Sequence, residues 1–442
     1  MQSDVLFVYA GITSCGFASF GKGPDSSWIS HGLSILSSCL KKAGYSVELI
    51  DLRRLTDWKE FEDKIEKRKP EIVGLTMMSV DFNPVMKSIE IIKKINPKAK
   101  VIVGGPHPTL ASEEVVANKK IDYIILGEGE IVLPILIRDI KSGKKRERVI
   151  QGLKPDLDKI PFADRELFWA FEIPIVPELP EPFVSIIAGR GCIYNCNFCK
   201  PAEDKLFGRP VRRRSVENVL TELKVLQDKY HFKSLMIHDD CLTEDRDWVV
   251  QFCRQYKKEG FKQPFVCQSR ADIICRNEDM VKLMAQAGLY MYLIGFESGN
   301  QRVLNFIRKG TTVEQNLKVA EICRKYGIRV WANYMLGLPT ETREEIQDTV
   351  AMIRKIHPDY FSPAFFTPHP GSDLYDYCQK HKLSLIKNHD QYRRDPTEAK
   401  IKGQDYLFLR KALEESRKIN FEDKVWRFAR RRAQKIWWQI TV

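Results

Sequence analysis

The sequence predicts an α/β protein with two parallel-sheet domains and a mostly helical C-terminal segment. Short apolar runs alternate with helix-like segments over residues 1–145 and again over residues 183–371. Such alternation is typical of parallel strands joined by crossover helices. A connector broken by prolines separates the two stretches, over residues 146–182, and residues 372–442 form the C-terminal segment. A chain of 442 residues is long enough for more than one hydrophobic core.

The first stretch predicts a doubly wound, Rossmann-like domain, in which helices cover both faces of the sheet. Strands are expected at residues 5–9, 46–52, 72–77, 101–104 and 123–126. Helices are expected at residues 34–42, 58–67, 84–94 and 112–118. Ligands of such sheets bind at the carboxyl ends of the strands, so the residues at those ends are the first candidates for a site.

Glycines and small hydroxyl side chains gather at these strand ends, where they let a large planar ligand approach the backbone. The expected ligand contacts are Gly11, Thr13, Ser14, Thr76, Met77, Ser79, Gly104, Gly105, Pro106, His107, Gly127, Glu128 and Gly129. A plain nucleotide site is disfavoured, because the segment after the first strand, residues 11–16, lacks the Gly-x-Gly-x-x-Gly pattern.

The second stretch predicts a partial (β/α)6 barrel, whose chemistry belongs at the carboxyl ends of its strands. Strands are expected at residues 183–188, 235–237, 265–268, 292–296, 329–335 and 360–366. Helices are expected at residues 215–230, 248–257, 280–287, 313–326 and 344–356. A capping box from Thr342 to Glu345 predicts where the last of these helices begins.

Three cysteines follow the first strand of this second stretch. Cys192, Cys196 and Cys199 have the spacing Cys-x3-Cys-x2-Cys. Their thiolates could ligate three irons of a [4Fe–4S] cluster and leave the fourth iron open. A structural zinc site would need a fourth ligand, and no Cys or His stands nearby at zinc-finger spacing. The close spacing also argues against three unrelated buried cysteines.

With Phe198 directly before the last cysteine, this motif resembles that of the radical S-adenosylmethionine (SAM) enzymes. The resemblance implies that the open iron binds the amino and carboxylate groups of SAM, and that reduction of the cluster cleaves SAM to a 5′-deoxyadenosyl radical. It also implies SAM contacts at strand ends, for which the candidates are Asp239, Arg270, Glu297 and Ser298. A guanidinium suits a carboxylate and a carboxylate suits ribose hydroxyls. Each of these residues could instead make a structural cap or ion pair.

The first stretch resembles the cobalamin-binding domain that precedes some radical SAM domains. The closest matches are residues 104–109 and 126–130. The Asp-x-His-x-x-Gly pattern, which supplies an axial histidine in other cobalamin proteins, is absent. The resemblance therefore implies base-off cobalamin without that histidine ligand. His107 could contact cobalamin, or it could be a turn residue fixed by the prolines on either side.

Together the two domains resemble the cobalamin-dependent radical SAM C-methyltransferases of class B. The resemblance implies that the radical abstracts hydrogen from an unactivated carbon, that methylcobalamin supplies the methyl group, and that a second SAM remethylates cobalamin. The substrate stays open; a peptide or protein side chain or a backbone carbon, for example in methyl-coenzyme M reductase, is one candidate. The alternative is cyclisation, ring contraction or oxygenation of a small molecule or lipid without methyl transfer.

Two further classes of protein are weaker alternatives. A binding or light-sensing cobalamin protein with a vestigial cluster is disfavoured by the complete cysteine motif. A tRNA-modifying enzyme is suggested by the formal net charge of +13, which favours acidic partners. No nucleic-acid-binding signature accompanies that charge, so no nucleic-acid partner is expected.

Composition also bears on location and partners. No apolar run is long enough for a membrane span, and the N-terminus lacks the pattern of a signal peptide. We expect a cytoplasmic protein whose eleven cysteines are free thiols or cluster ligands. We also expect a monomer, and the resemblance implies an external electron donor of the ferredoxin or flavodoxin type.

For three features we expect a structural role and no part in the chemistry. Arg212, Arg213 and Arg214 are expected to be solvated or to orient a helix, and Cys241 to be a buried inert thiol. The apolar residues of the C-terminal segment are expected to pack on the body of the protein. A helix lying on a membrane surface is the alternative for residues 421–442, where tryptophans alternate with arginines.

Overall fold

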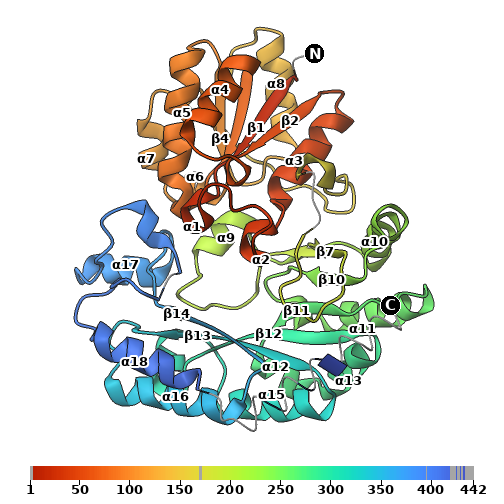
Figure 1. Ribbon diagram of the computed structural model, residues 1–442, viewed down its shortest axis with the longest axis vertical. Coiled ribbons are helices and arrows are strands. Elements are labelled where there is room, and N and C mark those ends of the chain that lie inside the picture. The colour runs from red at the N-terminus through yellow and green to blue at the C-terminus, as the bar shows by residue number, and fades with distance from the viewer. Residues whose placement is uncertain are drawn as a thin grey trace.

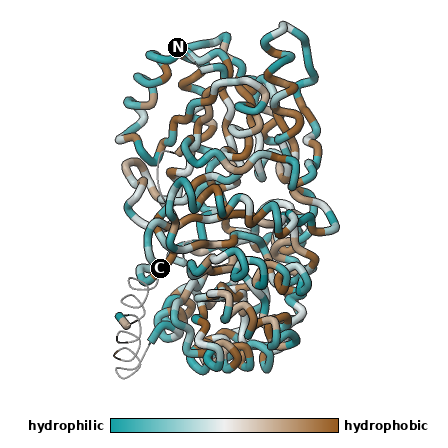
Figure 2. The backbone as a smooth tube through the Cα atoms, turned by 90° about the vertical axis from the view of Figure 1, so that its right-hand side faces the viewer, coloured by the Kyte–Doolittle hydropathy of each residue, from teal (hydrophilic) through white to brown (hydrophobic). Residues whose placement is uncertain are grey.

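The computed structural model describes residues 3–168, 172–394 and 396–418, together with residues 425, 429, 432 and 433. Two parallel six-stranded sheets lie one above the other, the first from the N-terminal part of the chain and the second from the part after residue 182 (Figure 1). The predicted two-domain α/β architecture is confirmed. Figure 2 shows the same stacking from the side, with hydrophobic stretches running through both domains.

The first sheet has the strand order β2-β1-β3-β4-β5-β6. Its strands are β1 (Val5–Tyr9), β2 (Val47–Asp51), β3 (Ile72–Thr76), β4 (Lys100–Gly104), β5 (Tyr123–Leu126) and β6 (Val149–Gln151). The order reverses between β1 and β3, which is where ligands bind in doubly wound sheets. Gly104 ends β4 and Gly127 directly follows β5, so both stand at the carboxyl edge of the sheet, as the sequence predicted.

Helices cover both faces of this sheet because the side chains of its strands alternate. Leu6 and Val8 of β1 pack in one apolar cluster with α4 and α5, whereas Val5 and Phe7 pack in another with α3 and α8. The helices and short turns of this domain are α1 (Ile12–Cys15), α2 (Pro24–Ser27), α3 (His31–Lys42), η1 (Leu52–Arg54), α4 (Trp58–Arg68), η2 (Ser79–Asp81), α5 (Phe82–Ile95), α6 (Pro106–Leu110), α7 (Ser112–Ala117) and α8 (Val132–Lys141).

Strand β6 was not predicted. It pairs in parallel with β5, with Val149 opposite Ile124, so the first sheet extends beyond residue 145 into the expected connector. The strand has only three residues and its side chains are exposed or half-buried. An edge strand of this kind carries no apolar run by which a sequence pattern could show it. The remainder of the connector includes the turn η3 (Arg165–Phe168).

The second sheet has the order β14-β13-β12-β11-β10-β7, an open half-barrel of parallel strands. Its strands are β7 (Phe183–Ile186), β10 (Ser234–Ile237), β11 (Phe265–Ser269), β12 (Leu289–Glu297), β13 (Arg329–Leu336) and β14 (Tyr360–Phe365). The outer helices and turns are α10 (Val216–Tyr230), η4 (Leu242–Glu244), α11 (Arg246–Lys258), α12 (Ala271–Arg276), α13 (Glu278–Gln286), α14 (Gln301–Phe306), α15 (Val313–Lys325) and α16 (Arg343–Ile356). The capping box from Thr342 to Glu345 is confirmed.

The connector and the C-terminal segment cover other parts of the half-barrel. Ile175, Val176 and Leu179 of the connector pack with Phe183 and Met236 in one apolar cluster. The elements after β14 are α17 (Asp373–Lys380), η5 (His389–Tyr392) and α18 (Tyr406–Ser416). Helix α18 buries Leu409, Ala412 and Leu413 in the core cluster of the half-barrel, which confirms packing on the body for this helix.

Trp426, Trp437 and Trp438, on which the membrane-surface alternative for residues 421–442 depends, lie outside the described residues, as does Trp169 in the connector. Among the described residues, no helix combines the length and the apolar character that a membrane crossing requires.

Candidate functional site

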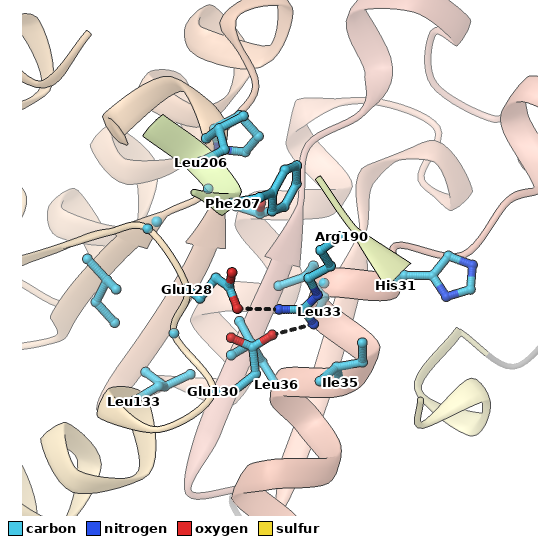
Figure 3. Close-up of a pocket in the computed structure, with 18 of the residues that line it drawn as sticks. His31, Leu33, Ile35, Leu36, Glu128, Glu130, Leu133, Arg190, Leu206 and Phe207 are labelled. Atoms are coloured by element: carbon cyan, nitrogen blue, oxygen red, sulfur yellow. Dashed lines mark hydrogen bonds and ion pairs between the residues drawn. The ribbon is translucent and has the colours of Figure 1, made fainter. Parts of the chain in front are cut away.

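A cavity of about 340 Å³ lies between the two domains. The first domain contributes α3 and the loops after β3, β4 and β5, and the second contributes the segment after β7 and helix α9 (Ala202–Phe207). Figure 3 shows Leu33, Leu36 and Leu133 on one side of this space and Leu206 and Phe207 on another. The volume and the mostly apolar lining are typical of a small-molecule or cofactor site.

Glycines keep the first-domain wall of the cavity flat. A Cβ atom on Gly105 would lie 2.8 Å from Thr76 Oγ1, and the φ angle of Gly105, +107°, also disfavours other residues. A Cβ atom on Gly74 would lie 2.7 Å from the ring of Phe7. Side chains are therefore excluded where the wall meets the cavity, and the wall fits a large flat ligand such as cobalamin.

The structure brings about half of the predicted cobalamin contacts to this wall. Those that line the cavity are Thr76, Gly104, Gly105, Pro106, Gly127, Glu128 and Gly129. Those that lie away from it are Gly11, Thr13, Ser14, Met77, Ser79 and His107. Thr13 and Ser14 belong to α1, where the carbonyl oxygen of Thr13 accepts a hydrogen bond from Arg393. Met77 is fully buried in the first-domain core.

His107 does not reach the cavity, although its neighbours Gly105 and Pro106 do. Its imidazole is fully buried, with Nδ1 3.0 Å from Ser79 Oγ. The expectation that His107 or Ser79 contacts cobalamin is therefore not met by this arrangement. His107 is a residue of the short helix α6, and its ring packs beside those of Phe82 and His389.

One arginine joins the two sides of the cavity. Arg190, on the short strand β8 (Gly189–Arg190), donates to Glu128 Oε2 and Glu130 Oε1 at 2.7 Å each (Figure 3). These carboxylates come from the loop after β5, and all three side chains are at most 11% exposed. Since charges buried to this degree are costly unless paired, the three groups hold the two domains together in one geometry.

The cysteine loop follows directly after Arg190. Cys192 is half-buried, Cys196 is buried, and Cys199 faces open space. A turn places them, with the amides of Cys199 and Lys200 donating to Cys196 O at 3.0 and 2.9 Å. Three thiols and no other ligand type fit the three-iron attachment of a [4Fe–4S] cluster.

Burial raises the pKa of the Cys192 thiol to about 11. The Cys192 thiol is therefore protonated in the free protein at neutral pH. Iron must displace this proton when the cluster binds, since thiolates are the ligands.

Arg270 and Glu297 stand beside this loop. Arg270 Nη1 is 3.6 Å from Cys196 Sγ, and the guanidinium lies over the ring of Tyr194, 3.5 Å from its centroid. Glu297 Oε1 accepts from Lys309 Nζ at 2.8 Å, and both side chains are at most 11% exposed. Glu297 ends β12 at a bulge with φ of +61°, a left-handed conformation that a non-glycine residue adopts only when its surroundings impose it.

The other two predicted SAM contacts have structural partners instead. Ser298 is fully buried, with Oγ 3.1 Å from Thr349 Oγ1. Asp239 accepts from the amide of Ala188 at 2.7 Å and from Arg213 at 3.0 Å. Asp239 thus fixes the strand end from which the cysteine loop departs, which is a positioning role.

The interpretation of Arg212, Arg213 and Arg214 as solvated residues is wrong, whereas the alternative that they orient a helix fits Arg214, which contacts Asn218 and Glu222 of α10. Each pairs with a carboxylate: Arg212 with Glu128, Arg213 with Asp239 and Glu244, and Arg214 with Glu222. The arginines are next to one another in sequence, but their partners come from four different segments. Cys241, in contrast, is a buried thiol as expected.

Sequence reasoning missed several residues of the cavity, among them Leu206, Phe207 and His31. His31 begins α3 and lies with Nε2 2.8 Å from Ser185 Oγ, and burial lowers its pKa well below the usual value. Arg190 and Glu130 were also missed, although a lone arginine and an acidic pair at two strand ends are a charge pattern that could have suggested a contact.

Comparison with known proteins assigns both domains. Residues 24–137 match the B12 binding domain family, and residues 186–353 match the radical SAM superfamily. An uncharacterized methyltransferase of Pyrococcus horikoshii is 30% identical over 380 residues, which cover 82% of this chain and 81% of that protein. The chain belongs to the cobalamin-dependent radical SAM enzymes.

A second relative of this cobalamin-dependent radical SAM enzyme is the anaerobic magnesium-protoporphyrin IX monomethyl ester cyclase of Rubrivivax gelatinosus. It is 28% identical over 395 residues, which cover 84% of this chain and 69% of the cyclase.

Solved structures share the fold of this cobalamin-dependent radical SAM enzyme. The radical SAM enzyme OxsB, with aqua-cobalamin and SAM bound, superposes with a TM-score of 0.74 at 16% identity, over 98% of this chain and 72% of that one. The methyltransferase TsrM of Kitasatospora setae, with tryptophan substrate and a SAM analog bound, has a TM-score of 0.67 at 17% identity, over 90% of this chain and 84% of that one. At such identities the likeness concerns the fold.

Proposed function

We propose that the enzyme transfers a methyl group from SAM, through cobalamin, to an unactivated carbon of its substrate. The observation that carries this proposal is the shared cavity: the glycine-lined wall of the first domain and the segment that leads to the cluster cysteines face the same space. Two cofactors that must act on one substrate carbon need such a common pocket.

When bound, the cluster with SAM supplies a carbon-centred radical and the cobalamin supplies a methyl group. The protein's own residues have the tasks of holding and shielding. Arg190 with Glu128 and Glu130 holds the distance between the two walls. Ile187, Leu206 and Phe207 line the space between them with apolar surface, which excludes water from a reactive intermediate.

Arg270 and Glu297 are the SAM contacts that we propose. Arg270 lies against Cys196 and presents a cation where a carboxylate would bind the open iron. Glu297 presents buried carboxylate oxygens close to Lys309, on a bulge that the backbone would not adopt without support. Strain of this kind is characteristic of residues held for a ligand.

The Pyrococcus relative, named a methyltransferase, supports methyl transfer. The Rubrivivax relative, named a cyclase, supports the second candidate, in which the same two cofactors drive cyclisation, ring contraction or oxygenation without methyl transfer. We propose a peptide or protein carbon as substrate, such as one in methyl-coenzyme M reductase. The support for it is the formal net charge of +13, which favours an acidic or large partner. We also propose a monomer that receives electrons from a ferredoxin or flavodoxin.

Isotope labelling tests the proposal. The cluster-loaded, cobalamin-loaded enzyme is incubated with reductant, SAM carrying a labelled methyl group, and candidate substrates, including peptides from methyl-coenzyme M reductase. We expect labelled product together with 5′-deoxyadenosine. A converted substrate that carries no label, with 5′-deoxyadenosine still released, would replace methyl transfer by the second candidate.

A further inference from the structure

Three metal-ligating side chains meet on the far side of α6 from the cavity. His107 of α6, Glu114 of α7 and His389 of η5 each direct one ligand atom to a common point, and these atoms lie within 4.8 Å of one another. The two oxygens of Glu114 are divided between the histidines: Oε1 is 2.8 Å from His107 Nε2 and Oε2 is 3.1 Å from His389 Nε2. None of the three residues lines the cofactor cavity.

The polar atom at the centre of this group is not satisfied by the protein. His107 is 0% exposed, and within the described part of the chain its Nε2 makes no hydrogen bond of acceptable geometry, despite the short distance to Glu114. A buried imidazole nitrogen without a partner is costly, so such an atom needs another explanation. A bound cation provides one, because it accepts the lone pair of the nitrogen directly.

Neighbouring groups hold both imidazoles in place. His107 Nδ1 is 3.0 Å from Ser79 Oγ. This contact orients the ring and leaves Nε2 directed at Glu114 and His389. A hydrogen bond to the second nitrogen is the usual support of a metal-ligating histidine. The ring of His389 stacks on Phe82, with centroids 3.9 Å apart and planes at 16°. Side chains that are held in this way are preorganised and need little rearrangement to bind an ion.

We propose that His107, Glu114 and His389 bind a divalent metal ion of the zinc type. Two imidazole nitrogens and one carboxylate are a ligand set that suits zinc, and adjacent ligands of a tetrahedral ion lie about 3.4 Å apart, close to the two distances above. Glu114 and His389 are 39% and 22% exposed, so water can take the fourth position from the solvent side.

The metal would tie the C-terminal segment to the cobalamin-binding domain. His389 follows β14 and α17, whereas His107 and Glu114 belong to the first domain. Hydrogen bonds already join the same surfaces, from Asn83 to Asp390 at 3.1 Å and from Arg393 to Thr13 O at 3.3 Å. The ion would strengthen the contact between the C-terminal segment and the first domain. It would also fix the position of α6, whose first residue, Pro106, lines the cavity.

Zinc binding by the full-length, cluster-reconstituted enzyme tests the proposal. The protein is treated with a chelator that leaves the iron content unchanged, and is then titrated with zinc alone against a chromophoric competitor. Glu114→Gln and His389→Ala each remove one ligand at a partly exposed position. Glu113→Gln is the matched control, because Glu113 is an exposed acid on the same turn.

We expect one zinc ion per chain, with nitrogen and oxygen ligands and no sulfur in its X-ray absorption spectrum. Loss of a ligand should weaken binding by about a hundredfold or more, and Ser79→Ala, which removes only the supporting hydrogen bond, by about tenfold to a hundredfold. Zinc should raise the unfolding midpoint of the parent and of Glu113→Gln, but not that of Glu114→Gln. Sulfur ligation, or equal zinc binding by Glu113→Gln and Glu114→Gln, would overturn the proposal.

Discussion

Arg190 Nη1 donates to Glu128 Oε2 at 2.7 Å across the boundary between the two domains. The same guanidinium donates to Glu130, and Glu128 also forms an ion pair with Arg212. The cysteine loop begins two residues after Arg190, and the glycine wall includes both neighbours of Glu128. This ion pair therefore links the segment that leads to the cysteine loop with the glycine-lined wall of the cavity.

Replacement of Arg190 by Ala should destabilise the contact between the domains. Glu130 would remain buried without its arginine, and Glu128 would keep only Arg212. Removing one partner of a buried ion pair typically costs about 3–5 kcal/mol. Chemical denaturation should show a lower free energy of unfolding or a separated first transition. Arg209→Ala removes an exposed arginine that pairs with Asp204 and should behave like the parent. A third variant, Arg190→Met with Glu130→Gln, should recover part of the loss, because Glu130 no longer carries a charge and Glu128 keeps Arg212 as its partner. Equal stability of Arg190→Ala and Arg209→Ala would contradict the assigned role.

Replacement of Cys196 by Ala should abolish cluster binding and 5′-deoxyadenosine formation while cobalamin still binds. The cysteines that we propose as cluster ligands all come from one loop, whereas the glycine wall comes from the first domain. Iron and cobalamin content of the purified protein measure the two effects separately. Cys275→Ala, at a half-buried cysteine outside the loop, is the control and should keep both cofactors. Simultaneous loss of both cofactors from Cys196→Ala would argue against separate sites.

Glu297 and Ser298 are neighbours but should respond differently to substitution. Glu297→Gln removes a charged acceptor and should weaken SAM binding to the cluster-loaded enzyme by about tenfold or more, since hydrogen bonds to charged groups contribute roughly 1.5–3 kcal/mol. Ser298→Ala removes the contact with Thr349 and should lower stability by about 1 kcal/mol without changing the Kd for SAM. Equilibrium dialysis with labelled SAM gives both affinities.

The pairing of Glu297 with Lys309 calls for a further control. Glu297→Gln alone leaves the Lys309 ammonium buried without its partner, which could weaken SAM binding indirectly. The double variant Glu297→Gln with Lys309→Met removes both charges. SAM affinity should stay low in the double variant if Glu297 contacts SAM, and a return to the parent affinity would assign Glu297 a structural role only.

Glu341 should contribute to a fall in stability with rising pH between about 4.5 and 7, as should Asp81 and Asp240, whose pKa values burial also raises to about 7. Glu341 Oε2 accepts from the amides of Gly337 and Leu338, whereas Oε1 is buried and, within the described residues, lacks a hydrogen bond. Burial raises the pKa of this carboxyl from 4.5 to about 7. The folded state thus keeps a proton that the unfolded state has lost in this interval, so ionisation favours unfolding, by at most about 3.5 kcal/mol overall.

Urea denaturation at pH 5, 6, 7 and 8 measures this dependence. Glu341→Gln should flatten the decline, because a neutral amide takes the place of the protonated acid. Glu344→Gln, at an exposed acid in the first turn of α16, should keep the slope of the parent protein. An unchanged slope in Glu341→Gln would show that the carboxylate is ionised in the folded protein over this whole range.

The order of elements and the cysteine motif were readable from the chain because both depend on nearby residues. Apolar alternation predicted five strands of the first sheet and six of the second, which the structure confirms. The capping box from Thr342 to Glu345 spans four residues and was predicted with its partners. Strand β6 was not predicted, because its pairing with β5, and not its own composition, makes it a strand.

The site is different, since its decisive contacts join residues far apart in sequence. Arg190 and Glu128 are 62 residues apart, and His389 meets Glu114 only because η5 returns to the first domain. The sequence by itself determined the two sheets, the cluster loop and the glycine-lined strand ends, because periodicity, propensity and spacing act locally. The tertiary structure alone decided which polar groups are buried together, and hence that Arg190 links the walls of the cavity, that His107 does not line it, and that burial raises the pKa of Glu341.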